Sequence, residues 1–288
     1  MALRKLVVVR GGGDIATGTI CRLFNCGYMV LVLETKRPSA IRRNVALSEA
    51  VYEGESQVEN VKCVLAADVE GAFVVMERNQ VAMIVAPNID EVLPEITRLC
   101  HMKKVKYTAL VDGILAKKNL GTRRGMAPIT IGLGPGFEGG KDVDAAIETM
   151  RGHGLGRILY RGKPMPDTKT PGIIAGVGKE RVIHAPAKGV LRNVSKITDT
   201  VKKGQVIAEI ADESTGDITP VYASIDGLLR GLIRDGYYVT EGFKIADIDP
   251  RTGEYDNCFT ISDKARCIAG GVLEAILHLE NKGGKLWL

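Results

Sequence analysis

The stretch LVVVRGGGDIATG, residues 6–18, decides how the first part of the chain folds. Its apolar residues indicate a buried strand, its three glycines a tight turn, and the residues from Asp14 onward a helix. Gly11, Gly13 and Ala16 fit the pattern G-x-G-x-x-A, in which a dinucleotide pyrophosphate lies on a helix N-terminus. The stretch therefore predicts a nucleotide-binding turn.

A second apolar strand follows at residues 30–33 and ends on Glu34. This acid comes about 20 residues after the turn, where a carboxylate can accept both hydroxyls of a ribose. The ligand contacts predicted here are Gly11, Gly12, Gly13, Asp14, Thr17 and Glu34. The alternative is that the glycines only permit close strand-to-helix packing and that Asp14 only stabilises the helix dipole.

Four cations follow the second strand, at Lys36, Arg37, Arg42 and Arg43. They lie where a 2′-phosphate or another anionic tail of a nucleotide would sit, and Arg42 is included among the predicted cofactor contacts. Glu34 favours an unmodified ribose, whereas Lys36 and Arg37 favour a 2′-phosphate. The sequence therefore does not decide between NAD-like and NADP-like ligands. A solvated basic loop is the other interpretation.

Length and composition limit the class of protein. The 288 residues suffice for two domains, and the net charge of +5 with 5% aromatic residues disfavours nucleic-acid binding. No apolar run approaches the roughly 20 residues that span a bilayer. Met1 leads almost directly into a strand, so we expect no signal peptide and a cytoplasmic protein.

The six cysteines show no C-x-x-C spacing, so we expect neither a zinc site nor a disulfide framework, and no protein-bound metal. Cys258 precedes a predicted helix N-terminus with Lys264 nearby, an arrangement that lowers the pKa of a thiol. An ordinary thiol is the alternative. We expect Cys267, inside that helix, to pack inward.

The order of apolar and helical stretches predicts an α/β fold with four segments. These are a Rossmann-like parallel-sheet domain over 1–115, a glycine-rich middle segment over 116–180, a two-repeat, barrel-sandwich-hybrid-like β domain over 181–250, and a C-terminal helix within 251–288. Apolar residues at helical spacing between Ala265 and Leu279 predict that this last helix docks by one face.

The β domain is predicted from an internal repeat. Residues 185–210 align without a gap on 223–248, with nine identities in 26 positions. The shared pattern resembles half of the barrel-sandwich hybrid of biotinyl and lipoyl carriers. The joint at 211–218 contains no lysine, so the domain is not expected to be a carrier.

The middle segment contains IGLGPGF at 131–137, and we expect a polar helix over 142–151. Alternating glycines free backbone N–H groups to form an anion-binding concavity. Arg151, His153 and Arg157 follow closely. The predicted contacts of this second site are Gly134, Gly136, Arg151 and His153. The sequence assembles no catalytic triad or acid pair, so whether the protein is an enzyme stays open.

Several motifs together resemble the accessory proteins of the selenium-dependent molybdenum hydroxylase system, the YqeB-like family. They are distantly similar to the xanthine dehydrogenase accessory factors. The motifs are RGGGDIATG at 10–18, PSAIRR at 38–43, APNIDEVLPEI at 86–96, IGLGPGF at 131–137, IETMRGHGLGR at 147–157 and ISDKAR at 261–266.

The resemblance implies a maturation role in which the protein binds a molybdenum pterin cofactor, with or without its dinucleotide extension, or a related nucleotide, for processing or insertion. It implies a hydroxylase apoenzyme and other selenium or molybdenum maturation proteins as partners. It supplies no catalytic residues. Two alternatives stay open: an NAD(P)-dependent oxidoreductase that uses the same turn, and a nucleotide-sensing interaction protein. A homo-oligomer also stays open.

Overall fold

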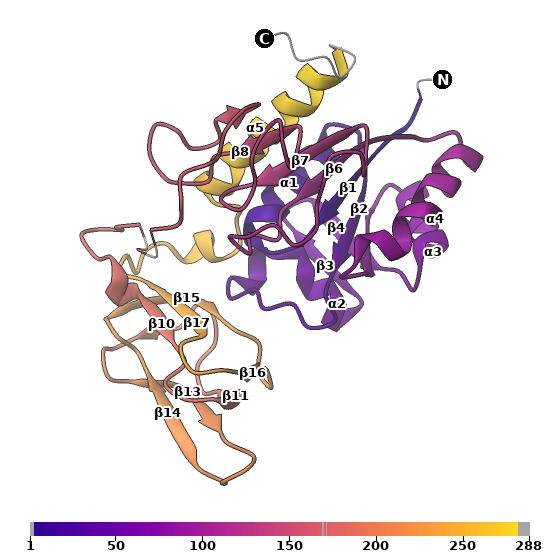
Figure 1. Ribbon diagram of the computed structural model, residues 1–288. Coiled ribbons are helices and arrows are strands. Elements are labelled where there is room, and N and C mark those ends of the chain that lie inside the picture. The colour runs from indigo at the N-terminus through magenta and orange to yellow at the C-terminus, as the bar shows by residue number, and fades with distance from the viewer. Residues whose placement is uncertain (1–2, 169, 171, 282–288) are drawn as a thin grey trace. The chain divides into compact units, whose positions relative to one another are not determined.

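The protein consists of two compact units, and the computed structural model describes residues 3–168, 170 and 172–281 (Figure 1). The large unit contains residues up to 38, residues 46–167 and residues from 261 onward. The β unit contains residues 39–45 and 168–260. The predicted middle segment thus divides between the units, and the last seven residues of the predicted C-terminal segment lie outside the described residues.

The large unit is organised around a nine-stranded sheet of order β3-β4-β5-β2-β1-β6-β7-β8-β9. Neighbouring strands from β4 to β8 are parallel, whereas β3 and β9 are antiparallel edge strands. The strands are β1 Lys5–Arg10, β2 Met29–Glu34, β3 Glu55–Val58, β4 Val61–Leu65, β5 Val81–Val85, β6 Lys106–Asp112, β7 Ile129–Leu133, β8 Ala145–Ile147 and β9 Ile158–Leu159.

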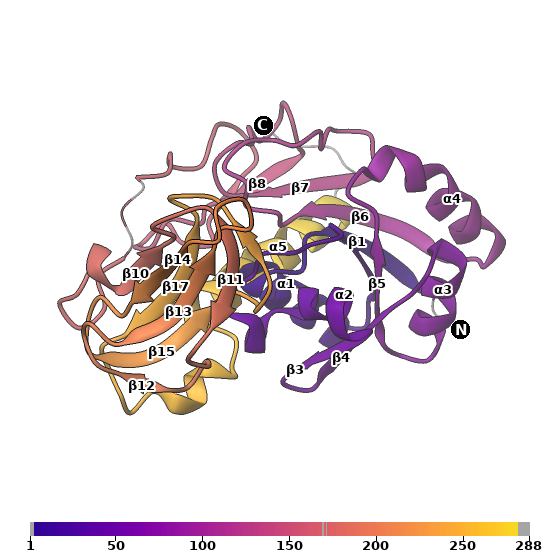
Figure 2. The same cartoon turned by 90° about the horizontal axis from the view of Figure 1, so that it is seen from below.

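The central strands of the sheet are apolar, so helices cover them. On one face, α3 (Val69–Glu77) and α4 (Ile89–Met102) contact each other and share a core with Leu6 and Val8 of β1 (Figure 2). The short α2 (Ala50–Glu53) precedes β3. Within the described residues, no helix has the length and apolar character that crossing a membrane requires.

The other two helices, α1 (Asp14–Asn25) and α5 (Asp263–Asn281), pack closely against each other. A side chain at Gly18 would lie 2.8 Å from the Cβ of Ala265, so this glycine permits the contact. Between Ala265 and Leu279, α5 buries the apolar residues predicted to form its docking face, which confirms that expectation.

The predicted fold class is wrong. The large sheet is mixed rather than parallel, and the β unit consists of two four-stranded antiparallel sheets, so few helices accompany many strands. The predicted sheet ends near residue 115, because the glycine-rich stretch that follows lacks an alternation of strands and helices. The sheet continues there through β7, β8 and β9, while β3 folds back on β4 through a two-residue turn at Glu59 and Asn60.

The polar helix predicted over 142–151 is also wrong, because this stretch contains β8. The three residues of β8 are buried, which requires an extended strand inside the sheet. The acids before it bind backbone instead of lying on a helix surface. Asp142 accepts a hydrogen bond from Glu138 N at 3.0 Å, and Asp144 accepts one from Thr130 N at 2.8 Å.

The β unit consists of the sheets β10-β17-β15-β12 and β14-β13-β11-β16, all antiparallel. Their inward-facing apolar residues share one core. The strands are β10 Val182–His184, β11 Gly189–Asn193, β12 Thr200–Val201, β13 Val206–Ala211, β14 Ile218–Tyr222, β15 Gly227–Leu232, β16 Tyr238–Val239 and β17 Lys244–Asp249.

The two copies of the repeat occupy equivalent positions in these sheets. Leu191 pairs with Ile210 in the first copy, and Leu229 pairs with Ile248 in the second, so the registers match after a shift of 38 residues. The copies also exchange their short strands, since β16 pairs with β11 and β12 pairs with β15. The β unit is therefore pseudo-twofold, with each copy completing the sheet of the other.

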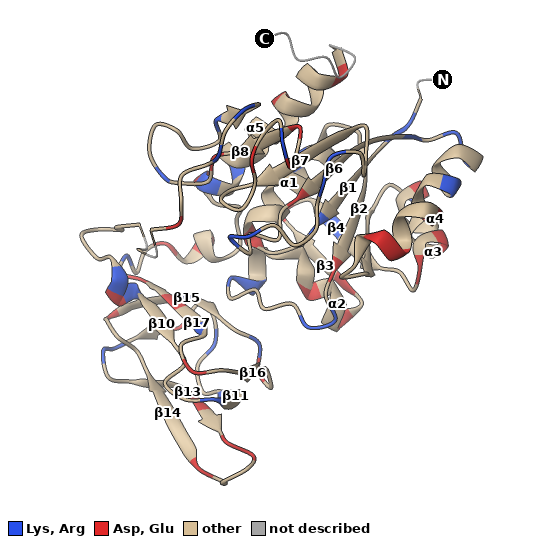
Figure 3. Cartoon of the chain, in the orientation of Figure 1, with Lys and Arg blue, Asp and Glu red and all other residues tan. Residues whose placement is uncertain are grey.

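Charged residues around β15 and β17 form a buried network of ion pairs. Figure 3 colours the ribbon of the β unit by charge, with Lys and Arg blue and Asp and Glu red. Asp249 is completely buried and accepts Arg230 Nη1 at 3.2 Å and Arg251 Nη2 at 2.8 Å. Burial raises the pKa of Asp249, but the hydrogen bonds from Arg251 and the charges of Arg230 and Arg251 together lower it by more than burial raises it. The net shift of this pKa is downward, as expected of a carboxylate held by guanidinium groups.

Equivalent glycines of the repeat are expected to be equally intolerant of a side chain. An added Cβ would lie 2.3 Å from Ala211 O at Gly189 and 2.3 Å from Asp249 O at Gly227. We expect each alanine substitution to lower the free energy of unfolding by about 2 kcal/mol or more, because a backbone oxygen cannot move away. Urea denaturation measures this, with Gly253→Ala as the control, since nothing lies within 4 Å there. Equal effects at all three glycines would contradict the packing argument.

The acid sensitivity of the β unit should depend on Asp249. Because its pKa is lowered by folding, its contribution to stability is present above about pH 4 and is lost as the pH falls through its folded-state pKa. We expect Asp249→Asn to cost about 3 kcal/mol at pH 7, because buried guanidinium charge loses its partner. The free energy of unfolding of the variant should also fall less between pH 5 and pH 3, because unfolding no longer involves the uptake of one proton by this carboxylate. Urea denaturation at several pH values tests this, and an unchanged pH profile would refute it.

Candidate functional site

The glycine turn between β1 and α1 lies at the carboxyl edge of the parallel strands. Gly11 has φ +87°, and an added Cβ would lie 3.1 Å from the Cα of Ile114. At Gly12 an added Cβ would meet Met83 Cε at 3.0 Å and Ser48 N at 3.1 Å. The positive φ therefore favours glycine at position 11, and close packing leaves little room for a side chain at position 12.

Gly13 differs from its neighbours. It is the N-cap of α1 with φ −65° and ψ 175°, which any residue can adopt, and nothing lies within 4 Å of an added Cβ. Neither conformation nor internal packing demands glycine at this position. The open space lies beside the first turn of α1, where backbone N–H groups have no partner within the helix and the dipole favours an anion.

Glu34 ends β2 and contacts the turn directly. Its Oε1 accepts the N–H of Gly12 at 2.8 Å, and its Oε2 accepts the N–H of Thr35 at 2.6 Å. Burial raises the pKa of Glu34, although these backbone hydrogen bonds oppose the shift. The residue predicted to bind a ribose is thus engaged in holding the turn.

Thr17 and Asp14 also take structural positions. The Thr17 hydroxyl is buried, donates to Gly12 O at 3.1 Å and accepts from Leu47 N at 3.0 Å. Its hydrogen bonds are made within the protein, and it is not directed toward the open space. Asp14 is the first residue of α1, where a carboxylate stabilises the helix dipole.

A buried ion pair next to the turn was missed from the sequence. Arg10 and Asp112 are 4% and 2% exposed, and Arg10 Nη1 lies 3.1 Å from Asp112 Oδ2. Thr122 Oγ1 accepts from Arg10 Nη1 at 2.6 Å and donates to Asp112 Oδ2 at 2.7 Å. Arg10 also donates to the carbonyl of Leu120 at 3.2 Å. A charged residue that ends an apolar strand was the available signal, in VVVR and in ALVD.

This ion pair marks the point where the strand order reverses. Outward from β1, the sheet contains β2, β5 and β4 on one side and β6, β7 and β8 on the other. In open sheets with parallel strands, ligands bind outside the carboxyl ends of the strands at this switch point. The glycine turn lies at the end of β1 at this position.

The second predicted contact set does not converge. An added Cβ at Gly134 would lie 2.6 Å from Thr149 Oγ1, and one at Gly136 would lie 2.7 Å from the Lys118 backbone, so both glycines serve close packing. Arg151 forms a two-pronged ion pair with Asp263, at 2.7 and 3.1 Å.

The other candidates have different surroundings from those predicted. His153 is exposed, and Arg42 belongs to the β unit, where it donates to Asn257 O at 3.0 Å. Cys258 is buried, and burial raises the pKa of its thiol, contrary to the predicted lowering. Cys267 is exposed and its Sγ donates to Leu155 O at 3.2 Å, so the expectation that it packs inward was wrong.

Comparison with known proteins gives one close relative. No family model matches the chain. The chain is similar to YqeB. It is 46% identical over 281 residues to the uncharacterized protein YqeB of Escherichia coli strain K12, covering 98% of this chain and 49% of the relative. This fits the resemblance to YqeB-like proteins, and the chain spans about half the length of the relative.

Solved structures give weaker likenesses. The ectoine utilization protein EutE (DoeB) of Ruegeria pomeroyi has a TM-score of 0.27 at 9% identity, with 86% of each chain covered. An aspartoacylase family protein of Mesorhizobium loti has a TM-score of 0.29 at 11% identity, with 87% of this chain and 86% of that chain covered. Likeness at this level carries no conclusion about the site.

The Arg10–Asp112 pair should be a strong determinant of stability. Arg10→Met leaves a buried carboxylate without its cation, and we expect a loss of about 3–5 kcal/mol in the free energy of unfolding. Arg10→Met combined with Asp112→Asn should lose less than the sum of the two single substitutions, because the double variant leaves no unpaired charge in the core.

Urea denaturation of the four proteins measures this coupling. The control is Arg98→Met, which removes an exposed ion pair to Glu70 and should change stability by about 1 kcal/mol or less. Additive losses in the double variant would show that the two residues do not act as a pair.

Proposed function

We propose that the large unit binds a phosphate-bearing nucleotide at the N-terminus of α1, namely a molybdenum pterin cofactor in its dinucleotide form. The protein would act in the maturation of a selenium-dependent molybdenum hydroxylase. The observation that carries the binding site is the open space at Gly13, at the switch point of the sheet. The identity of the ligand rests on the sequence motifs alone; the similarity to YqeB supports the resemblance to YqeB-like proteins and not a particular ligand.

The turn offers its binding groups in a defined order. The N–H of Gly12 is already bound to Glu34, so a phosphate would accept hydrogen bonds from Gly13 and the residues that follow it. The missing side chain at Gly13 lets the phosphate approach the backbone, and the dipole of α1 favours its charge. Arg10 and Asp112 neutralise each other, so this pair contributes rigidity rather than net charge to the site.

The pterin end of the cofactor would be held differently. Gly134, Gly136, Arg151 and His153 do not form a cation-lined cavity, so these residues do not fit a bound pterin. We therefore assign the pyrophosphate of the cofactor to this chain and leave the pterin free for the hydroxylase apoenzyme. Handing over the pterin first would suit a maturation protein.

Substitution of Gly13 tests the site. Gly13→Val should preserve the fold, because its φ and ψ suit a branched residue and nothing lies within 4 Å of the new Cβ. Its γ-carbons would occupy the phosphate position, so we expect the affinity for the pterin dinucleotide to fall about tenfold or more, the loss of one charge-assisted hydrogen bond. Gly253→Val is the control, since Gly253 lies in the β unit with equally open surroundings.

Native mass spectrometry with the molybdenum cofactor, NAD(H) and NADP(H) in equal amounts gives the measurement. A mass shift that matches the pterin cofactor, lost in Gly13→Val, supports the proposal. A shift that matches only a nicotinamide dinucleotide would favour the oxidoreductase alternative. If folded Gly13→Val binds the cofactor as well as the wild-type protein does, the glycine turn is not the binding site.

A further inference from the structure

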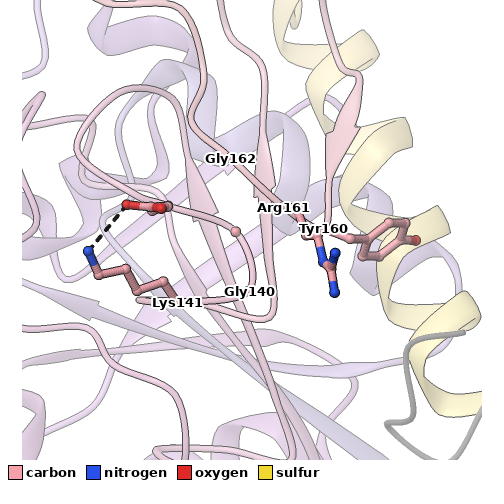
Figure 4. Close-up of a pocket in the computed structure, with 7 residues that line it drawn as sticks. Gly140, Lys141, Tyr160, Arg161 and Gly162 are labelled. Atoms are coloured by element: carbon pink, nitrogen blue, oxygen red, sulfur yellow. Dashed lines mark ion pairs between the residues drawn. The ribbon is translucent and has the colours of Figure 1, made fainter. Parts of the chain in front are cut away.

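The large unit contains a pocket that the glycine turn does not use. It has a volume of about 330 Å³ and lies between the loop that joins β7 to β8 and the segment that follows β9 (Figure 4). Its lining residues are Glu138 to Lys141 on the first segment and Tyr160 to Gly162 on the second. We infer that this pocket binds a small molecule bearing a phosphate group.

Backbone contacts hold the two sides of the pocket together. Gly139 N donates to Gly162 O at 2.8 Å, and Gly140 N donates to Val143 O at 2.8 Å. An added Cβ at Gly139 would lie 2.0 Å from Leu159 O, so a glycine is needed for this contact. Nothing lies within 4 Å of an added Cβ at Gly162, where the space belongs to the pocket. The pocket is thus built from fixed main chain.

Cations outnumber carboxylates at its rim. Lys141 and Lys163 both approach Glu138 Oε2, at 3.5 and 3.4 Å, and both lysines are about 70% exposed. Burial alone would raise the pKa of Glu138, but the two lysines lower it, so the carboxylate stays ionised. One carboxylate holds two ammonium groups in place, which leaves a net positive charge for an anion.

Arg161 supplies the third cation. Its side chain is exposed, and within the described residues no hydrogen bond or ion pair to its guanidinium is found. Figure 4 places Lys141 on one side of Gly140 and Gly162 and Arg161 on the other. A guanidinium presents paired N–H groups that match phosphate oxygens. An anion bound over Gly140 and Gly162 would therefore have Lys141 on one side and Arg161 on the other.

Tyr160 anchors the second segment of the pocket, because its side chain extends toward α5 and away from Lys141 (Figure 4). Burial and the nearby charge of Glu274 raise the pKa of its hydroxyl, so the phenol keeps its proton at physiological pH. Its ring packs 5.0 Å from the ring of His278 on α5, which orients it. Cations on two sides and a volume of about 330 Å³ suit a phosphorylated metabolite.

The test titrates inorganic phosphate into the full-length protein and follows binding by ³¹P line broadening and calorimetry at constant ionic strength. We use the Gly13→Val background, so that phosphate bound at the glycine turn does not contribute. Phosphate should still bind, and Lys141→Gln combined with Arg161→Gln should weaken it about tenfold or more. The matched control removes two exposed cations of the β unit, in Arg192→Gln combined with Lys196→Gln.

A gain of affinity gives a second readout that a damaged fold cannot mimic. Glu138→Gln removes the carboxylate that competes for both lysines, so phosphate should bind more tightly. No binding to the Gly13→Val protein, or equal binding after loss of Lys141 and Arg161, would overturn the inference. Binding that disappears with Gly13→Val alone would assign the phosphate to the turn, and this outcome would leave the proposed nucleotide site intact while refuting the pocket.

Discussion

The buried ion pair between Arg10 and Asp112 is the interaction on which the carboxyl edge of the large sheet depends. A charge that is almost completely buried must be paired and hydrogen-bonded, because desolvation otherwise costs several kcal/mol. Arg10 meets this requirement with Asp112, Thr122 and the carbonyl of Leu120. The pair thereby joins β1 to β6 and fixes the loop after β6 over the edge. The glycine turn begins one residue after Arg10, so its position follows from this constraint.

Glu34 imposes a second constraint on the same edge. A carboxylate that accepts the Gly12 N–H orders the turn before any ligand arrives, and preorganised donors bind an anion at lower cost. It also places negative charge close to the site, so a bound phosphate must accept from Gly13 and the first turn of α1. In the turn, the N–H of Gly12 is therefore bound to Glu34, whereas the N–H groups that follow it are the ones offered to a ligand.

The sequence predicted the parts of the fold that depend on local periodicity. The strands β1 and β2 and the buried face of α5 lie where the apolar patterns indicated. The Arg10–Asp112 pair joins residues 102 positions apart, and no local pattern reports such a contact. Gly134 and Gly136 show a different limit, because a glycine suits an anion cradle and close packing equally well. Only their neighbours, Thr149 and the Lys118 backbone, decide between the two.

The β unit is assembled from residues 39–45 together with 168–260, so the chain passes between the two units four times. Leu232 N bonds to Ile41 O at 2.8 Å, and Arg43 Nε bonds to Leu232 O at 2.8 Å, which ties the short piece to the long one. A single flexible linker would let the units diffuse independently, but four crossings act as a multiple tether. One of these crossings begins only four residues after Glu34. Glu34, whose carboxylate holds the glycine turn, is therefore separated from the β unit by only a few residues of chain.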